Sequence, residues 1–352
     1  MGKKLEAVVT SDWHLMSLAK HFRDHVERQL EEVEKIYQYA ESNSIRHIFV
    51  VGDISDTPFM PYDVYYKLLL FMRKYDGLVN TYYIPGNHDF SDVSKTSLDL
   101  LNVLCREKFF SSLYLYPEVT TERIDGVRVN FLPYPCNEAP ESKKPALNLS
   151  HVSYNGALND TGRRMRVSDE FIQNSHDFNI SGHIHQYQKL KSKRAIYNGS
   201  PFQKNFGESL PKGFIHIVAG VQDGRMRVQH KFVNNKPDFQ LLNIIVKKRD
   251  DLKKLSTSDA YRYKLWVAPD VSLPSNLMTD YPNITGGVFD LESRKATKEV
   301  SDQSQEALSD PNANTINLRS GLKEFLRNDG LDKDQRKLAK KEIDKAISHL
   351  GL

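Results

Sequence analysis

The sequence predicts an α/β fold, a two-sheet β-sandwich flanked by helices, followed by a small α/β unit and a C-terminal helical pair. Three observations support this prediction. In the first third of the chain, short apolar runs alternate with longer stretches of helical periodicity, which is typical of parallel strand and helix units. From Leu113 onward the pattern becomes mostly that of strands. Beyond residue 237 a second, smaller set of strands and helices follows, and two amphipathic stretches end the sequence.

The first third provides three strands and three helices in alternation. The strands are expected at Leu5–Thr10, His47–Asp53 and Thr81–Pro85, and the helices at Phe22–Ser42, Pro61–Asp76 and Ser97–Phe110. Alternation of this kind favours parallel pairing, with the helices outside the sheet.

The next part, up to the turn-like segment Asn234–Pro237, is expected to be mostly β. Two hairpins are predicted, at Asp125–Gly126 and around Asp223–Gly224, because the Asp-Gly pair favours tight turns. Further strands are expected at Ala146–Val152, Phe178–Ser181, Arg194–Tyr197 and Gly213–Ala219. The mostly β second half of the core predicts two sheets packed face to face, with helices outside.

The last part is expected to fold separately. Strands at Phe239–Lys247, Tyr261–Ala268 and Gly287–Leu291, with a helical turn at Asp250–Leu255, indicate the small α/β unit. The polar segment Lys298–Thr315 is typical of a linker, and helices are expected at Ile316–Asn328 and Asp334–Leu350. The predicted domain boundaries are therefore 1–236, 237–297, 298–315 for the linker and 316–352 for the helical pair.

Composition indicates an ordinary globular protein. Of the 352 residues, 39% are hydrophobic and 27% charged, and no apolar run approaches the roughly 20 residues of a membrane helix. The start of the chain does not resemble a secretory signal, and two cysteines cannot build a disulfide framework, so a reducing cytoplasm is expected. The net charge of +4 permits a polyanionic substrate without requiring one.

Four short motifs and one isolated histidine lie at the ends of predicted strands. The motifs are Asp12-Trp-His14, Gly52-Asp53, Gly86-Asn-His-Asp89 and Gly182-His-Ile-His185, and the histidine is His151. Ligands bind at the carboxyl ends of strands in open α/β sheets, and glycine lets the backbone turn sharply there. These side chains are therefore expected to converge.

The mixture of side chains suits a pair of divalent cations. The candidate ligands are Asp12, His14, Asp53, Asn87, His151, His183 and His185. Carboxylate, imidazole and carboxamide groups suit manganese, iron or zinc, and Asp53 can bridge two cations that clamp an in-line displacement. A single histidine at a strand end is more often a core residue than a ligand, but five of the twelve histidines, namely these four candidates and His88, fall at such strand ends.

As a series, these motifs resemble the calcineurin-like metallophosphoesterase superfamily over about residues 5 to 220. The resemblance implies one metal held by Asp12, His14, Asp53 and His185, and a second held by Asp53, Asn87, His151 and His183. It also implies that His88 faces the phosphate and stabilises the transition state or protonates the leaving oxygen. Asp89 would orient His88 by accepting its other ring proton.

A further set of motifs resembles the SbcD-type nucleases of double-strand-break repair. It consists of Tyr197-Asn-Gly-Ser-Pro201, Phe206-Gly-Glu208 and Lys212-Gly-Phe214, together with the opening Ser11-Asp-Trp-His-Leu15. The resemblance implies a manganese-dependent enzyme that acts as a duplex exonuclease and a single-strand endonuclease in DNA end processing, recombination and repair. The expected cofactor is two divalent metal ions, most often manganese in this family.

The same resemblance implies an architecture and partners. Residues 237–297 would form a capping domain, and residues 316–352 would bind an SbcC-type ATPase in a heterotetramer built on a nuclease homodimer. The docking positions would be Ile316, Leu322, Phe325, Leu326, Leu338, Ile343, Ile347 and Leu350. The chain is similar in build to the compact recombination nucleases of large bacteriophages, which implies the cytoplasm of a bacterium or of an infected host cell. The alternative for the two helices is packing on their own core.

Some positions depart from the pattern or admit two interpretations. Asp56 stands where some relatives carry a histidine, so no imidazole is supplied there. Candidate DNA contacts are Arg163, Arg164 and Arg166, and the run Lys189, Lys191, Lys193 and Arg194. Either basic cluster can equally be a solvated loop.

Two other functions stay open from the sequence. The metal motifs alone would also serve a standalone metallophosphatase or a small-molecule phosphodiesterase. A scaffold that binds DNA ends without cleaving them is the third hypothesis, although a complete set of ligands argues against it as the only role.

Overall fold

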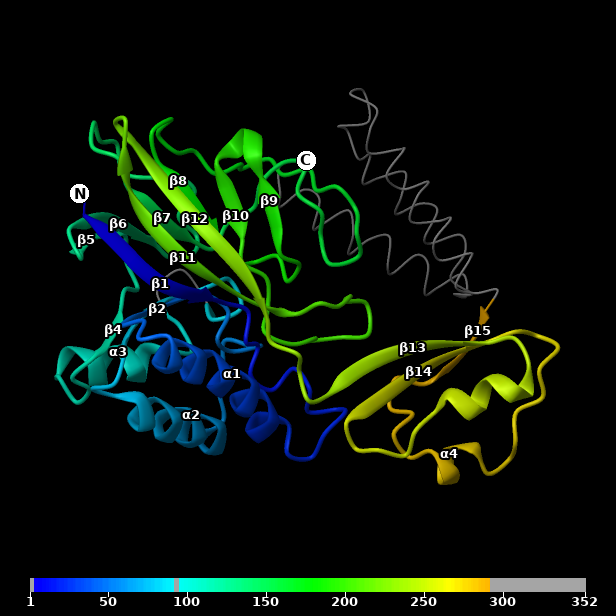
Figure 1. Cartoon of the computed structure of the whole chain (residues 1–352). Helices are drawn as coiled ribbons and strands as arrows, with labels where there is room; N and C mark the ends of the chain where they lie inside the picture. Colours follow the sequence, from blue (N-terminus) through cyan, green and yellow to red (C-terminus); the bar gives the residue numbers. More distant parts are fainter. Residues whose placement is uncertain (1–2, 92–94, 292–352) are drawn as a thin grey trace, which may run out of the picture. The chain divides into compact units, whose positions relative to one another are not determined.

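The computed structural model describes residues 3–91 and 95–291 (Figure 1). The chain forms one compact unit up to Phe289, and a second unit begins at Asp290. The predicted linker and helical pair, residues 298–352, lie outside the described residues. The predicted domain boundaries therefore stay predictions.

The first of two six-stranded sheets has the order β12-β11-β1-β2-β3-β4. Its parallel strands are β1 (Lys4–Thr10), β2 (His47–Val51), β3 (Asn80–Ile84) and β4 (Leu113–Leu115). The hairpin of β11 (Gly213–Gln222) and β12 (Arg225–Asn234) extends this sheet, with β11 antiparallel to β1. Strand β11, which is distant from β1 in the sequence, is therefore its neighbour in the sheet.

The second sheet has the order β5-β6-β7-β8-β10-β9. Its strands are β5 (Thr120–Ile124), β6 (Val127–Leu132), β7 (Leu147–Ser150), β8 (Phe178–Ser181), β9 (Gln188–Leu190) and β10 (Ala195–Tyr197). Strands β6, β7, β8 and β10 run parallel, and β9 is followed by a 3₁₀ turn at Lys191–Lys193.

An apolar core fills the space between the two sheets. Alternate residues of β1, namely Leu5, Ala7 and Val9, contribute to it from one side, and Phe131 and Leu149 contribute from the other. Val8, between two of these residues, belongs instead to the core on the opposite face of the first sheet. Burial on both faces explains why the strands of this sheet are nearly continuous apolar runs.

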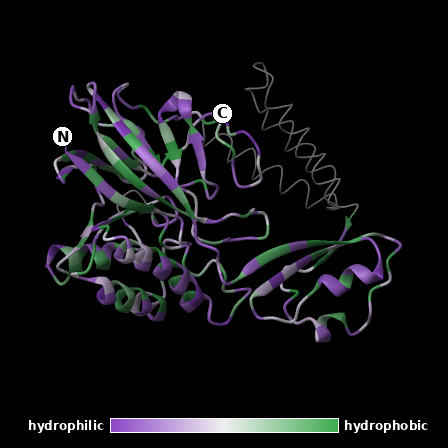
Figure 2. Ribbon diagram, viewed as in Figure 1, coloured by the Kyte–Doolittle hydropathy of each residue, from purple (hydrophilic) through white to green (hydrophobic). Residues whose placement is uncertain are grey.

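Three helices cover the outer face of the first sheet (Figure 1): α1 (His25–Ser42), α2 (Tyr62–Tyr75) and α3 (Asp99–Arg106). Hydrophobic and hydrophilic residues alternate along both helices and strands (Figure 2). On the second sheet, a separate cluster that includes Tyr154, Phe171 and Tyr197 packs without any helix of the described chain. The helices therefore flank the sandwich on the side of the first sheet.

A smaller three-stranded sheet follows the sandwich. It consists of β13 (Gln240–Val246), β14 (Tyr261–Val267) and β15 (Val288–Asp290), with a 3₁₀ helix at Arg249–Lys254 and the short helix α4 (Leu277–Asp280). Strands β13 and β14 are parallel, and Val246, Tyr263 and Leu265 belong to a core of its own.

The predicted fold class, a helix-flanked two-sheet sandwich, is confirmed. Strands β4 and β9 and helix α4, of three or four residues each, were not anticipated, whereas the equally short β7, β8, β10 and β15 were. Helix α1 begins at His25 rather than at Phe22. Phe22 is buried because it packs on Phe239, with ring centroids 5.3 Å apart. The apolar pattern of the sequence therefore begins before the helix does. No helix within residues 3–91 and 95–291 has the length and apolar content of a membrane span.

Candidate metal centre

All seven predicted ligands lie at the carboxyl ends of parallel strands. Asp12 and His14 follow β1, Asp53 follows β2 and Asn87 follows β3, all in the first sheet. The remaining three, His151, His183 and His185, follow β7 and β8 of the second sheet. The centre therefore forms where the strand ends of both sheets meet.

One half of the centre gathers around His14. Its Nε2 atom lies 3.4 Å from a carboxylate oxygen of Asp53, 3.9 Å from one of Asp12 and 3.0 Å from Nε2 of His185. Asp12 in turn lies 3.7 Å from His185. The structure thus brings together the four residues predicted for the first metal.

The other half gathers around Asn87. Its side-chain oxygen lies 3.0 Å from Nε2 of His151 and 2.9 Å from Nδ1 of His183. Nε2 of His151 also lies 3.3 Å from Asp53 Oδ2, the same oxygen that faces His14. Asp53 is therefore shared between the two halves, as its predicted bridging position requires.

Four of the seven residues adopt the left-handed backbone region. Their φ angles are 55° at Asp12, 41° at His14, 53° at Asp53 and 84° at His183. Each such residue costs on the order of 1–3 kcal/mol unless its surroundings hold it there. Strain of this kind concentrates at functional sites, which supports a binding role for this cluster.

The three glycines beside the candidate ligands are required for different reasons. Gly52 has a φ of 95° and makes the sharp turn that the sequence predicted. Gly86 and Gly182 do not have positive φ. No side chain fits at these positions, because a Cβ atom would lie 2.3 Å from Asp53 Oδ1 at Gly86 and 2.3 Å from the carbonyl oxygen of Val51 at Gly182. Their role is close approach of neighbouring segments rather than turning.

The hydrogen bonds of two histidines show that the centre fits a cation. Nδ1 of His151 lies 2.9 Å from the carbonyl oxygen of Val51 and must donate to it, so Nε2 presents a lone pair. This lone pair faces oxygen atoms of Asn87 and Asp53, which are also acceptors. Such an arrangement is repulsive unless a cation or a proton lies among the three atoms.

His185 shows the same pattern. Its Nδ1 atom donates to the carboxylate of Glu208 at 2.9 Å, so its Nε2 lone pair points towards His14. Burial lowers the pKa of His14 to about 3 and, with the charge of His151, that of His183 to about 4, so these rings are neutral at pH 7. Burial also acts to lower the pKa of His151, but Asp53 and Asp12 outweigh it and raise the pKa to about 9. Without a cation, a proton is drawn to this position.

A buried ion pair stands behind His185. Glu208 is 5% exposed and Lys212 is 1% exposed, and the ammonium of Lys212 donates to Glu208, to the carbonyl oxygen of His185 and to Ser200. Asp160 also lies 3.1 Å from Nδ1 of His185. Sequence reasoning did not assign Glu208 or Asp160 to the site, although Glu208 belongs to a motif that the sequence singled out.

The segment Tyr197–Lys212 supports Asp12 as well. Nδ2 of Asn198 donates to Ser11 Oγ at 2.8 Å, and Ser11 Oγ donates to Asp12 Oδ2. The backbone nitrogen of Ser200 donates to the carbonyl oxygen of His185 at 3.2 Å, and the Ser200 side chain is buried. Ser200 therefore lies behind the candidate ligands and not at the rim of the centre.

His88 lies beside the ligands, but its predicted partner is not the one found. Its ring packs edge-on against His14 at 4.7 Å between centroids, and its backbone nitrogen donates to Asp53 at 2.9 Å. Nδ1 of His88 donates to the carbonyl oxygen of Asp56 at 2.8 Å, not to Asp89.

The prediction that Asp89 orients His88 is therefore wrong. The buried carboxyl of Asp89 accepts from the backbone nitrogens of Gly86 at 2.9 Å, Ser55 at 2.9 Å and Ile54 at 3.3 Å. Burial and the charge of Asp53 raise its pKa to about 7. Asp89 ties together the two loops that carry Asp53 and Asn87, a contact that could not be read from its position next to His88.

Asp56, the residue that departs from the pattern, has a defined place. Its Oδ1 atom lies 3.3 Å from Nδ1 of His14 and 2.9 Å from Nζ of Lys204. Asp56 therefore lies beside His14 on the side away from the other candidate ligands, together with Lys204, whose Nζ lies 3.2 Å from the same Nδ1.

Each of the two basic clusters contains both exposed and half-buried residues. Arg194 adopts a φ of 50° and donates to the carbonyl oxygens of Asp177 and Met226, so its guanidinium supports the fold. Lys193 pairs with Glu170 at 2.8 Å. Arg164, Lys189 and Lys191 are exposed, and Arg166 lines a cavity beside the centre.

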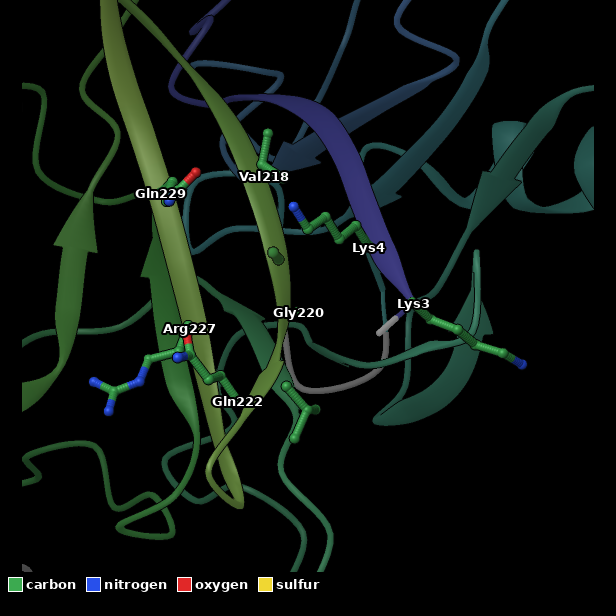
Figure 3. Close-up of a pocket in the computed structure, with 9 residues that line it drawn as sticks. Lys3, Lys4, Val218, Gly220, Gln222, Arg227 and Gln229 are labelled. Atoms are coloured by element: carbon green, nitrogen blue, oxygen red, sulfur yellow. The ribbon is translucent and has the colours of Figure 1, made fainter. Parts of the chain in front are cut away.

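That cavity has a volume of about 410 Å³, and its walls include His151 and His183. Another cavity, of about 260 Å³, lies among the N-terminal strand and the β11–β12 hairpin (Figure 3). Lys3, Lys4 and Arg227 line this second cavity, and none of the seven candidate ligands does.

Comparison with known proteins agrees with this geometry. The family model for calcineurin-like phosphoesterases matches residues 6–187, slightly more than half of the chain, and this range includes every candidate ligand. An uncharacterized protein of Acanthamoeba polyphaga mimivirus is 24% identical over 227 residues, which are 57% of this chain and 16% of that protein. The chain thus spans about a sixth of that relative's length.

Among solved structures, the Plasmodium protein GAP50, described as the anchor in the inner membrane complex, aligns with a TM-score of 0.40 and 11% identity. The alignment covers 66% of this chain and 85% of the Plasmodium chain.

Proposed function

The chain belongs to the calcineurin-like phosphoesterase family, and from this premise we propose that it is a DNA nuclease subunit that works with an SbcC-type ATPase in end processing, recombination and repair. The family implies a metal-dependent hydrolase of phosphoesters that binds two divalent metal ions, and the clusters described above contain candidate ligands. The proposal adds the substrate, DNA, the metal, manganese, and two activities, duplex exonuclease and single-strand endonuclease.

The chain's own residues would divide the work as follows. Asp12, His14 and His185 would hold one metal, Asn87, His151 and His183 the other, and Asp53 both. Bound cations supply Lewis-acid chemistry for phosphoester hydrolysis. His88 donates its Nδ1 proton to a backbone carbonyl, so the ring is fixed and Nε2 is the atom available to a phosphate oxygen or leaving group.

The observation that carries the nuclease proposal is the segment Tyr197–Lys212. Its motifs resemble those of SbcD-type nucleases, and the segment contacts the centre through Asn198, Glu208 and Lys212. Gln203 of the same segment exchanges hydrogen bonds of 3.0 and 3.1 Å with the backbone of Leu241 in the small sheet. The segment thus contacts both the metal centre and the unit proposed as a capping domain.

Two surface features support the proposed partners. Exposed Arg164, Lys189 and Lys191 are available to a phosphate backbone. On and beside α2, large apolar side chains are exposed: Phe59 by 76%, Tyr62 by 84%, Tyr66 by 51% and Leu70 by 53%. An apolar patch of this kind marks an interaction surface, and the proposed occupant is the second copy in a homodimer.

The test is a nuclease assay on linear duplex and single-stranded DNA, in manganese and in magnesium, with and without the ATPase. Asp53→Asn is expected to reduce cleavage by about 100-fold or more, because it weakens the ligand shared by both metals. Asp250→Asn, a substitution at an exposed aspartate of the small unit, is the control and should leave cleavage unchanged.

Other outcomes would overturn the proposal. Turnover of phosphoproteins or cyclic nucleotides without DNA cleavage would favour a standalone phosphatase or small-molecule phosphodiesterase. A His88→Ala protein that bound DNA ends and kept full biological function would favour a non-enzymatic scaffold.

A further inference from the structure

We infer that the cavity of about 410 Å³ beside the metal centre binds one unstacked base of the DNA substrate, next to the phosphate that is hydrolysed. This inference rests on the proposed nuclease function and names a subsite for it. The cavity lies within the range of roughly 300–1,000 Å³ that small-molecule sites occupy.

The position of the cavity is the first argument. His151 and His183, two of the predicted ligands, form part of its wall. A phosphoester held by the centre would therefore lie next to the cavity, and one of the groups attached to it could enter. The other lining residues come from the segments around Tyr134, Ser153 and Ser168.

An aromatic platform at the cavity is the second argument. Tyr134 is 40% exposed, and its ring packs on Phe90, with centroids 5.9 Å apart and planes at 60°. The backbone nitrogen of Tyr134 donates to the carbonyl oxygen of Pro85 at 3.1 Å, which fixes it to the loop that carries Asn87. A fixed, partly exposed ring is the element on which single-stranded bases stack in proteins that bind them.

The polar groups of the cavity favour a base over a second phosphate. Its wall carries Asp169 as well as Arg166, together with Asn137, Ser153 and Ser168. A carboxylate at this position opposes another anion, whereas the edge of a base offers both donors and acceptors to such a mixed set. The two charges and the neutral amide and hydroxyl groups therefore match a neutral heterocycle.

The first experiment compares cleavage of a single-stranded oligonucleotide with that of an abasic oligonucleotide of the same length. For the wild-type protein, KM is expected to be about tenfold higher on the abasic strand, as a stacked base contributes on this order. Tyr134→Leu should raise KM on the normal strand by a similar factor and leave KM on the abasic strand unchanged. Tyr134→Phe, which keeps the ring, should resemble the wild type.

Tyr114→Leu is the matched control. Tyr114 is 38% exposed, close to the 40% of Tyr134, but it lies on β4 and stacks on Tyr82 outside the cavity. This variant should leave KM unchanged on both strands. Manganese content and the thermal unfolding midpoint, measured for each variant, establish that the centre and the fold are intact.

The second experiment does not depend on cleavage. With calcium in place of manganese, binding of dAMP and of 2-deoxyribose 5-phosphate is measured by calorimetry. The wild type should bind dAMP about tenfold more tightly, and Tyr134→Leu should abolish the difference. Equal affinities, or a difference that survives in Tyr134→Leu, would overturn the inference.

The two experiments separate this inference from the proposed function. Cleavage of normal and abasic strands with equal KM refutes the base subsite and leaves the nuclease proposal standing. Preference for dAMP that depends on Tyr134, in a protein that cleaves no DNA, retains the subsite and refutes the nuclease proposal.

Discussion

Among the single residues, Glu208 makes a contact that fixes the ring of His185, one of the candidate ligands. Its carboxylate accepts from Nδ1 of His185 at 2.9 Å and is paired with Lys212. Burial acts to raise the pKa of Glu208, but His185 and Lys212 outweigh it and hold the pKa at about 2. The ionised carboxylate fixes the tautomer of His185 that leaves its Nε2 lone pair for a metal.

Glu208→Gln is expected to weaken metal binding by about 10- to 100-fold, since an amide orients the imidazole less strongly than a carboxylate does. Calorimetric titration of the metal-free protein with manganese measures this directly. Glu170→Gln, which affects the surface pair with Lys193, serves as the control.

Removal of the negative charge also leaves Lys212 buried without its partner, which destabilises the fold. The double variant Glu208→Gln, Lys212→Met removes the unpaired charge. It should recover thermal stability while metal binding stays weak. If metal affinity recovers together with stability, the role of Glu208 is structural only.

The convergence of the candidate ligands could be predicted from the sequence, but the residues that support them could not. Ligands such as Asp53 and His183 follow strands and stand next to glycines, and both features are visible along the chain. Glu208 and Asp160 reach His185 only through the tertiary fold, and the acceptor for the ring of His88 is a backbone carbonyl, which no side-chain pattern can indicate.

At the scale of elements, aromatic rings from both sheets meet inside the sandwich. Phe131 of β6 lies 6.0 Å from Phe49 and 5.8 Å from Tyr82 of the first sheet, and 4.3 Å from Tyr116, measured between ring centroids. These contacts hold the two sheets together close to the strands that end at the metal centre.

Phe131→Ala is expected to lower the free energy of unfolding by about 3–5 kcal/mol, because it removes a ring that is only 1% exposed and leaves a cavity. Phe109→Ala, at a ring that is 56% exposed, should change it by less than about 1 kcal/mol. Chemical denaturation of both variants gives the comparison, and equal losses would contradict the assignment of Phe131 to the shared core.

Long elements could be predicted throughout, and short ones only in part. Strands β1 to β3 and helices α1 to α3 have enough residues to show their period, and their expected and observed ranges overlap closely. The order of the strands was beyond sequence reasoning. Strand β11 lies beside β1, more than 200 positions away in the chain, because only tertiary packing decides which edge it joins.

At the scale of the whole molecule, the important feature is that the candidate ligands come from both sheets. Asp12, His14, Asp53 and Asn87 come from one sheet, and His151, His183 and His185 come from the other. Ligation by both groups would join the two sheets at the ends of their strands, where hydrogen bonds of the ladders no longer hold the chain.

Metal removal is therefore expected to destabilise the whole sandwich. Each site filled at about 100 times its dissociation constant stabilises the native state by about 2.7 kcal/mol, so a chelator should lower Tm by about 5–10 °C. Differential scanning calorimetry with and without chelator measures the shift. In Asp53→Asn the same treatment should have a much smaller effect, and an equal shift in both proteins would show that the metals stabilise another region.

The left-handed backbone at Asp12, His14, Asp53 and His183 has a consequence for the order of assembly. These four conformations are unfavourable in a free chain, so the loops that contain them gain nothing by adopting them early. They become favourable only when both sheets have docked and their side chains have partners. The metal-binding loops should thus be the last part of the sandwich to become protected during refolding, and the first to exchange amide hydrogens when the ions leave.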